Sequence, residues 1–80
     1  MGVHWRTLER LFENVTLDGR QDPETSAVKF TWRLEGIVLT ETQLSRTLAG
    51  RAGVSRNAIQ NRMECEKFEF RKSLTPEVLR

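Results

Sequence analysis

Hydrophobic positions near the start of the chain recur at the spacing of one helix face. The apolar side chains lie three, three, one and three positions apart, at Trp5, Leu8, Leu11, Phe12 and Val15. Charged side chains occupy positions between them, which is typical of an amphipathic helix. We therefore expect a helix over residues 1–16. Because Trp5 and Phe12 are large for so short a chain, they are candidate residues for self-association.

Further along the chain, apolar and polar residues alternate. The alternation runs through Val28, Phe30, Trp32 and Leu34, with Lys29, Thr31 and Arg33 between them. A period of two predicts a half-buried strand. A Glu35-Gly36 pair and a short apolar run follow, so residues 28–39 are expected to form a strand or a hairpin. If 28–34 is an edge strand, it offers a second surface for self-association.

The next apolar period is again helical, and its ends carry capping residues. Thr40 is a good N-cap, and Gln43 three residues later completes a capping box. Gly53 is expected to end this helix in the left-handed conformation. Ser55 is the N-cap of a further helix that runs to about Cys65, so two helices joined by a tight turn are expected over residues 40–65.

Two segments lack a clear period. Residues 17–27 are polar and contain the turn dipeptides Asp18-Gly19 and Asp22-Pro23, which predict a loop. In residues 66–80, Phe68 and Phe70 could alternate in a short strand, or Phe70 and Leu74 could lie on one helix face. Thr75-Pro76 then favours a final helical turn. The expected fold class is α+β and mostly helical, in one small domain of 80 residues.

Composition narrows the function classes. The chain has one cysteine and one histidine, so it cannot form an internal disulfide or a four-ligand structural zinc site. It has no glycine-rich phosphate loop and no cluster of catalytic residue types, so we expect neither an enzyme nor a metal or other cofactor. No apolar run approaches the roughly 18 residues of a membrane span. With no secretory start visible, a cytoplasmic protein with no membrane partner is expected.

The basic charge is uneven along the chain. The formal net charge is +2, yet residues 1–39 carry five basic and six acidic groups. Residues 40–63 carry four arginines against the single acid Glu41. The arginines of this stretch are Arg46, Arg51, Arg56 and Arg62. A local surplus of this kind favours an anionic partner.

The same stretch resembles the helix-turn-helix motif of bacterial and phage DNA-binding proteins. Ala49 is small enough for two helices to cross closely, Gly53 permits the turn, and Val54 and Ile59 fill the space between the helices. In such proteins the second helix lies in the major groove of double-stranded DNA. Arginine can bind guanine, and asparagine or glutamine can bind adenine. The residues expected to face the bases are Ser55, Arg56, Asn57, Gln60 and Asn61. Those expected at the DNA backbone are Thr40, Arg46, Arg51 and Arg62.

A longer resemblance covers about residues 28–76. A strand ending in Gly36, a helix opened by Thr40, the helix-turn-helix and a closing Leu74-Thr75-Pro76 are similar to the small DNA-binding modules of phage and homing endonucleases of the HNH and GIY-YIG types. The chain departs from them at Lys67-Phe68-Glu69, where that family often has Gly-Trp-Ser. Residues 1–27 have no counterpart. The resemblance implies a phage or bacterial regulator or accessory factor that binds specific DNA. Because a single short module gives limited affinity, we expect it to act as a dimer or in a larger complex.

A second hypothesis gives the same scaffold a different partner. Glu64, Glu66 and Glu69 lie beside the expected DNA face, and the first half of the chain is slightly acidic. These features favour a phage-encoded inhibitor or adaptor that binds a host protein, because a fold does not fix a function. The two hypotheses differ in whether the four arginines share one free surface or are paired with glutamates.

Overall fold

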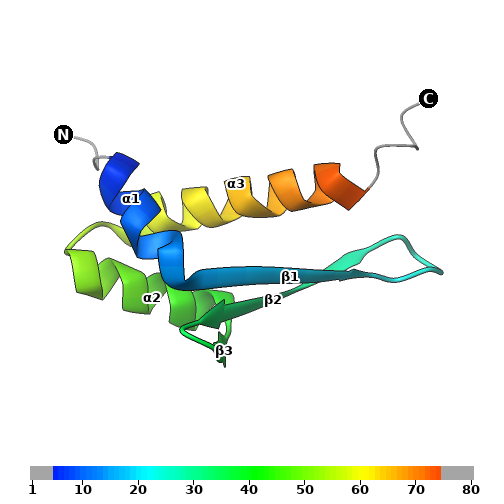
Figure 1. Ribbon diagram of the computed structural model, residues 1–80, viewed down its shortest axis with the longest axis horizontal. Helices are drawn as coiled ribbons and strands as arrows, with labels where there is room; N and C mark the ends of the chain where they lie inside the picture. Colours follow the sequence, from blue (N-terminus) through cyan, green and yellow to red (C-terminus); the bar gives the residue numbers. More distant parts are fainter. Residues whose placement is uncertain (1–4, 75–80) are drawn as a thin grey trace.

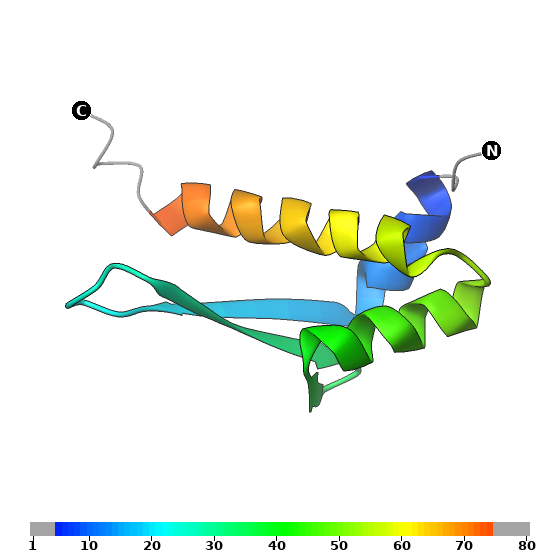
Figure 2. The same ribbon diagram turned by 180° about the vertical axis from the view of Figure 1, so that it is seen from behind.

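A three-stranded sheet and three α-helices make up the part of the chain described by the computed structural model, residues 5–74. The sheet is antiparallel with strand order β1-β2-β3, and helices account for most of the residues between 5 and 74. The expected class, α+β and mostly helical, is confirmed. Figure 1 and Figure 2 show the long helix α3 lying along one side of the β1–β2 hairpin, with α1 and α2 near one end of it.

The first helix is shorter than expected. Within the described residues, α1 spans Trp5–Leu11, and a 3-10 turn, η1, follows at Phe12–Asn14. The backbone is already extended at Val15. The carbonyl of Asn14 accepts a hydrogen bond of 2.9 Å from the amide of Glu35, so the end of η1 is tied to the β2–β3 turn. A helix continued to residue 16 would lose this connection.

The predicted loop over 17–27 is wrong in its first part. β1 spans Val15–Gln21 and pairs with β2, Val28–Leu34, in a register that sets Gly19 opposite Phe30. Aspartate and glycine are poor strand formers, which is why Asp18-Gly19 indicated a turn. The reversal comes later, where the amide of Asp22 donates to the carbonyl of Ala27.

A tight turn at Glu35 and Gly36 joins β2 to β3, which spans Ile37–Leu39. Both turn residues have positive φ, 53° and 85°, as a two-residue hairpin turn that follows the twist of the strands requires. The hairpin alternative for 28–39 is therefore correct. The expectation that 28–34 is an edge strand is wrong, because β2 is the central strand of the sheet.

Both helices of the second half start at the predicted caps. α2 spans Glu41–Ala52 and has the full capping box between Thr40 and Gln43. α3 spans Arg56–Leu74, so it continues nine residues beyond the predicted end at Cys65. Phe68 and Phe70 are both helical. The expected final turn at 75–79 lies outside the described residues.

The core lies where α2 and α3 meet the end of the sheet. Trp32 and Leu34 of β2 supply its sheet side. The helices and η1 supply the other buried side chains, which are Phe12, Leu44, Leu48, Ala49, Ile59 and Met63. Burial of these groups is the main stabilising term for so small a domain. Among residues 5–74, no helix is long and apolar enough to cross a membrane.

Candidate nucleic-acid interface

The joint between α2 and α3 is a short turn fixed by its own residues. Gly53 has φ of 66° and ψ of 32°, the left-handed conformation predicted for it. The amide of Val54 then donates to the carbonyl of Ala49 at 3.2 Å, closing the end of α2. At the start of α3, the hydroxyl of Ser55 accepts from the amide of Ala58 at 3.2 Å, which confirms it as an N-cap. Leu48 and Ile59 are 1% and 0% exposed, so the two helices are locked together beside this turn.

The first turns of α3 divide into a buried side and a polar exposed side. Ile59 and Met63 are buried in the core. The residues predicted to face DNA bases are all exposed: Ser55, Arg56, Asn57, Gln60 and Asn61. All but one of these lie within the helix, while Ser55 precedes it. The structure therefore brings together a row of arginine, amide and hydroxyl groups on one end of one helix.

The four arginines differ in how they are held. Arg46 and Arg56 are exposed, and neither has an ion pair with any other residue between 5 and 74. Arg51 reaches back to the β2–β3 turn, where its two terminal nitrogens donate to the carboxylate of Glu35 at 3.3 and 3.4 Å. Both side chains of that pair are about half exposed, so the contact is screened by solvent.

Arg62 is part of the packing. Its guanidinium lies 5.1 Å from the centre of the Phe12 ring, and its Nε donates to Glu66 at 2.9 Å. The side chain is 27% exposed. Arg62 thereby joins α3 to η1 through a cation–π contact and an ion pair. Phe12 itself is 8% exposed, so the prediction that it forms a self-association surface is wrong. The side chain of Trp5 lies outside the described part of the chain.

The start of α2 is already occupied by internal contacts. The amide of Thr40 donates to the side chain of Gln43, and the amide of Gln43 donates to the hydroxyl of Thr40. The carboxylate of Glu41 follows directly. These two amides therefore serve the capping box, and the nearby negative charge opposes a phosphate at this end.

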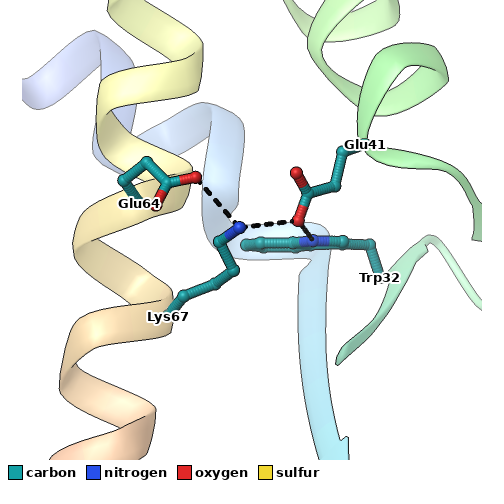
Figure 3. Close-up of polar contacts among 4 residues, drawn as sticks. All are labelled: Trp32, Glu41, Glu64 and Lys67. Atoms are coloured by element: carbon teal, nitrogen blue, oxygen red, sulfur yellow. Dashed lines mark hydrogen bonds and ion pairs between the residues drawn. The ribbon is translucent and has the colours of Figure 1, made fainter. Parts of the chain in front are cut away.

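A polar cluster that the sequence did not reveal ties α2, α3 and β2 together (Figure 3). One carboxylate oxygen of Glu41 accepts from the indole of Trp32 at 3.1 Å and from the ammonium of Lys67 at 3.0 Å. Lys67 also pairs with Glu64 at 2.9 Å. Lys67 is the well-covered member, with 13% of its side chain exposed. The cluster holds the start of α2 against the middle of α3, and so helps to fix the angle at which α3 is presented.

Burial and hydrogen bonding oppose each other in this cluster. Partial burial would raise the pKa of Glu41, but the hydrogen bonds from Lys67 and Trp32, with the charge of Lys67, outweigh it and lower that pKa. For Lys67, burial would lower the pKa, and the hydrogen bonds and charges of Glu64 and Glu41 raise it instead. Both groups are thus held in their charged forms. The spacing of residues 41, 64 and 67 gave no sign of this, because it depends on how α2 and α3 are placed.

Other site chemistries find little support in the described residues. Between residues 5 and 74, no group of three histidine, cysteine or acidic side chains is placed to hold a metal ion. No family model matches the chain, and no curated protein or solved structure matches it either. The geometry of α2, the turn and α3 is therefore what a functional proposal has to rest on.

Proposed function

We propose that the protein is a small sequence-specific DNA-binding protein that places the first half of α3 in the major groove. The observation that carries the proposal is the exposed row formed by Ser55, Arg56, Asn57, Gln60 and Asn61 on a helix whose opposite side is buried. A regulator or accessory factor in a bacterial cell or a phage-infected cell fits this activity.

The residue types suit recognition of base edges. Arg56 can donate two hydrogen bonds to guanine, and Asn57, Gln60 or Asn61 can bind adenine through paired donor and acceptor groups. Each such pair contributes about 1–3 kcal/mol of discrimination against a wrong base. Because Gly53, the capped start of α3 and the Glu41–Lys67 contact fix the helix, little ordering of the protein backbone is needed on binding.

Backbone contacts in this proposal come mainly from Arg46, because Arg56 is assigned to the bases. Arg46 has no ion-pair partner in the described part of the chain, so it can approach a phosphate without breaking a contact. Arg51 has to share its charge with Glu35, and Arg62 is engaged with Glu66 and Phe12. Thr40 contributes less than the sequence indicated, because its capping box uses the amides nearby. Few cations give modest affinity, so a dimer or a larger complex is expected on DNA.

Selection of binding sites from a pool of random duplexes tests this proposal. The full chain is expected to enrich a short motif, and the Gln60→Ala variant is expected to lose the preference at one position of that motif. Recovery of random sequences after repeated rounds would contradict specific recognition.

Two observations favour the second hypothesis, a module that binds a host protein. Arg51 and Arg62 are both paired with glutamates, and Phe68 on the same long helix is 59% exposed. An exposed aromatic residue is typical of a protein interface. Capture of a host protein that survives nuclease treatment, and that Phe68→Ala abolishes while Gln60→Ala does not, would favour this hypothesis over DNA binding.

A further inference from the structure

The sheet has one covered face and one open face. Phe70 of α3 packs on Gly19 and Phe30, so the face that carries these two residues is turned toward α3. Side chains alternate along a strand, so the intervening positions form the opposite face. This outer sheet face consists of Thr16, Asp18, Arg20, Lys29, Thr31, Arg33 and Val38. Figure 1 and Figure 2 both show the hairpin extending beneath α3, with no helix covering its far side near the tip.

The outer sheet face places two cations directly opposite each other. Arg20 of β1 and Lys29 of β2 are cross-strand partners in the register of the hairpin, and both are exposed. Neither has an ion pair with another residue between 5 and 74. Like charges directly opposite in an antiparallel pair are destabilising. An anionic partner bound at this rung would remove that repulsion.

The other end of the same face shows the usual arrangement. There Asp18 of β1 pairs with Arg33 of β2, so opposite charges offset each other. If the charged residues only kept this face soluble, a pair of opposite charges would serve equally well at the neighbouring cross-strand position of Arg20 and Lys29. Instead Arg20 and Lys29 leave a surplus of positive charge next to Thr31. A depression on this face is lined by these three residues together with Asp18, Gly19 and Arg33.

The spacing of the cations favours an extended anion. Lys29 and Arg33 are four residues apart on β2, so their backbone positions are separated by about 13 Å along the strand. Arg33 is already paired with Asp18, so the unpaired cations of this face are Arg20 and Lys29. A chain of phosphates can contact these two and continue past Thr31 toward Arg33, and the threonine hydroxyl can donate a further hydrogen bond to a phosphate oxygen.

We infer that the outer sheet face binds the phosphate backbone of nucleic acid, and that it holds a different duplex segment from the one bound by α3. The separation of the two sites follows from where they lie. The residues from Ser55 to Asn61 belong to the first turns of α3, whereas the outer sheet face is the face of the hairpin that α3 does not cover. One molecule would then bridge two duplexes, one held by base contacts and one by backbone contacts. The bridging rests on the proposed function of α3.

A two-duplex capture experiment tests the inference. A duplex carrying the selected site is fixed to a surface, the full chain is bound, and a second labelled duplex of unrelated sequence is added. The wild type is expected to retain the second duplex. The Arg20→Gln/Lys29→Gln variant is expected to remain on the first duplex while its retention of the second falls at least tenfold. A control with the same loss of charge, Arg10→Gln/Lys72→Gln, is expected to behave as the wild type.

The outcomes separate this inference from the function of α3. If the wild type and the Arg20→Gln/Lys29→Gln variant retain the second duplex equally, the inference is overturned. This outcome includes the case in which a dimer bridges the duplexes with its two copies of α3. Binding to vesicles of anionic phospholipid as tight as binding to duplex DNA would also overturn it. The protein could instead bind the first duplex without sequence preference, while Arg20→Gln/Lys29→Gln still weakens binding to a random duplex. That result would contradict the proposed function of α3 and support DNA binding by the outer sheet face.

Discussion

The ring of Phe70 lies directly against the backbone of Gly19. A Cβ atom at Gly19 would be 2.5 Å from Cε1 of that ring, closer than real Cβ contacts come. The ring also meets Phe30 edge to face, with 5.7 Å between the ring centres. This contact explains why α3 continues past Cys65 to Leu74, since its second half is held by the hairpin.

Gly19→Ala is expected to destabilise the protein by about 1–3 kcal/mol, because the new methyl group forces the ring of Phe70 to move. Urea unfolding measures the change. In a Phe70→Leu background the cost of Gly19→Ala is expected to shrink, since the smaller side chain leaves room. Gly50→Ala is the control, because it lies in α2 where the new methyl group meets no other part of the molecule within 4 Å beyond its neighbours in the helix backbone. A gain of up to about 1 kcal/mol is expected. Equal costs of Gly19→Ala in both backgrounds would contradict the contact.

Glu41→Gln is expected to lower stability by about 1 kcal/mol near neutral pH, because it removes the charge that holds Lys67 and Trp32. The pKa of Glu41 is lowered in the folded protein. Its contribution is therefore present above the pKa of the unfolded chain and is lost as pH falls through the lower folded value. The difference in stability between wild type and Glu41→Gln should narrow on acidification below the pKa of the unfolded carboxyl group. Urea unfolding across this range measures it, and a difference that stays constant with pH would count against the cluster.

Lys67 is expected to affect stability at alkaline pH, whereas Glu41 does so at acid pH. The pKa of Lys67 is raised, so its contribution is complete below the unfolded value and is lost as pH rises through the higher folded value. Lys67→Met is expected to remove this alkaline loss of stability. Lys72→Met serves as a control, because Lys72 is 61% exposed and its ion pair with Glu69 is long, at 3.8 Å. Identical alkaline profiles for the two variants would refute the role of Lys67.

Arg62 and Arg46 provide a matched pair of substitutions. Arg62→Ala is expected to cost about 1–2 kcal/mol of stability, because it removes the contact with the Phe12 ring and the pair with Glu66. Arg46→Ala is expected to change stability by less than about 0.5 kcal/mol, since Arg46 is exposed. Thermal unfolding compares the two. If Arg62→Ala leaves stability unchanged, the packing role of Arg62 is contradicted, and Arg62 is available to bind the DNA backbone as the sequence predicted.

Local signals predicted the elements well where a cap or a period was strong. The capping box at Thr40, the left-handed Gly53 and the N-cap at Ser55 all follow from residue types over a few positions. β1 was missed because its glycine is required by Phe70, which lies about fifty residues away in the sequence. A residue chosen for a distant contact carries no local strand signal.

The sequence predicted which residues of the candidate site are exposed, but not which of its arginines form ion pairs. Exposure of Asn57, Gln60 and Asn61 follows from helix period once Ile59 is known to be buried. The pairing of Arg51 with Glu35 depends on where the β2–β3 turn lies relative to α2, and no spacing within the sequence encodes that distance. The cross-strand pair of Arg20 and Lys29 could not be predicted either, because β1 itself was not expected.

Fluorescence anisotropy of a labelled duplex containing the selected site, measured over a salt series, tests the central claim most directly. The wild type is expected to bind with an affinity that falls as salt rises, and to prefer the site over a scrambled duplex. Arg56→Ala/Gln60→Ala is expected to bind both duplexes equally, whereas Arg46→Ala should weaken both alike and reduce the salt slope by about 0.9. Absence of salt-dependent binding by the wild type at low ionic strength, or an unchanged preference in Arg56→Ala/Gln60→Ala, would contradict DNA recognition by α3.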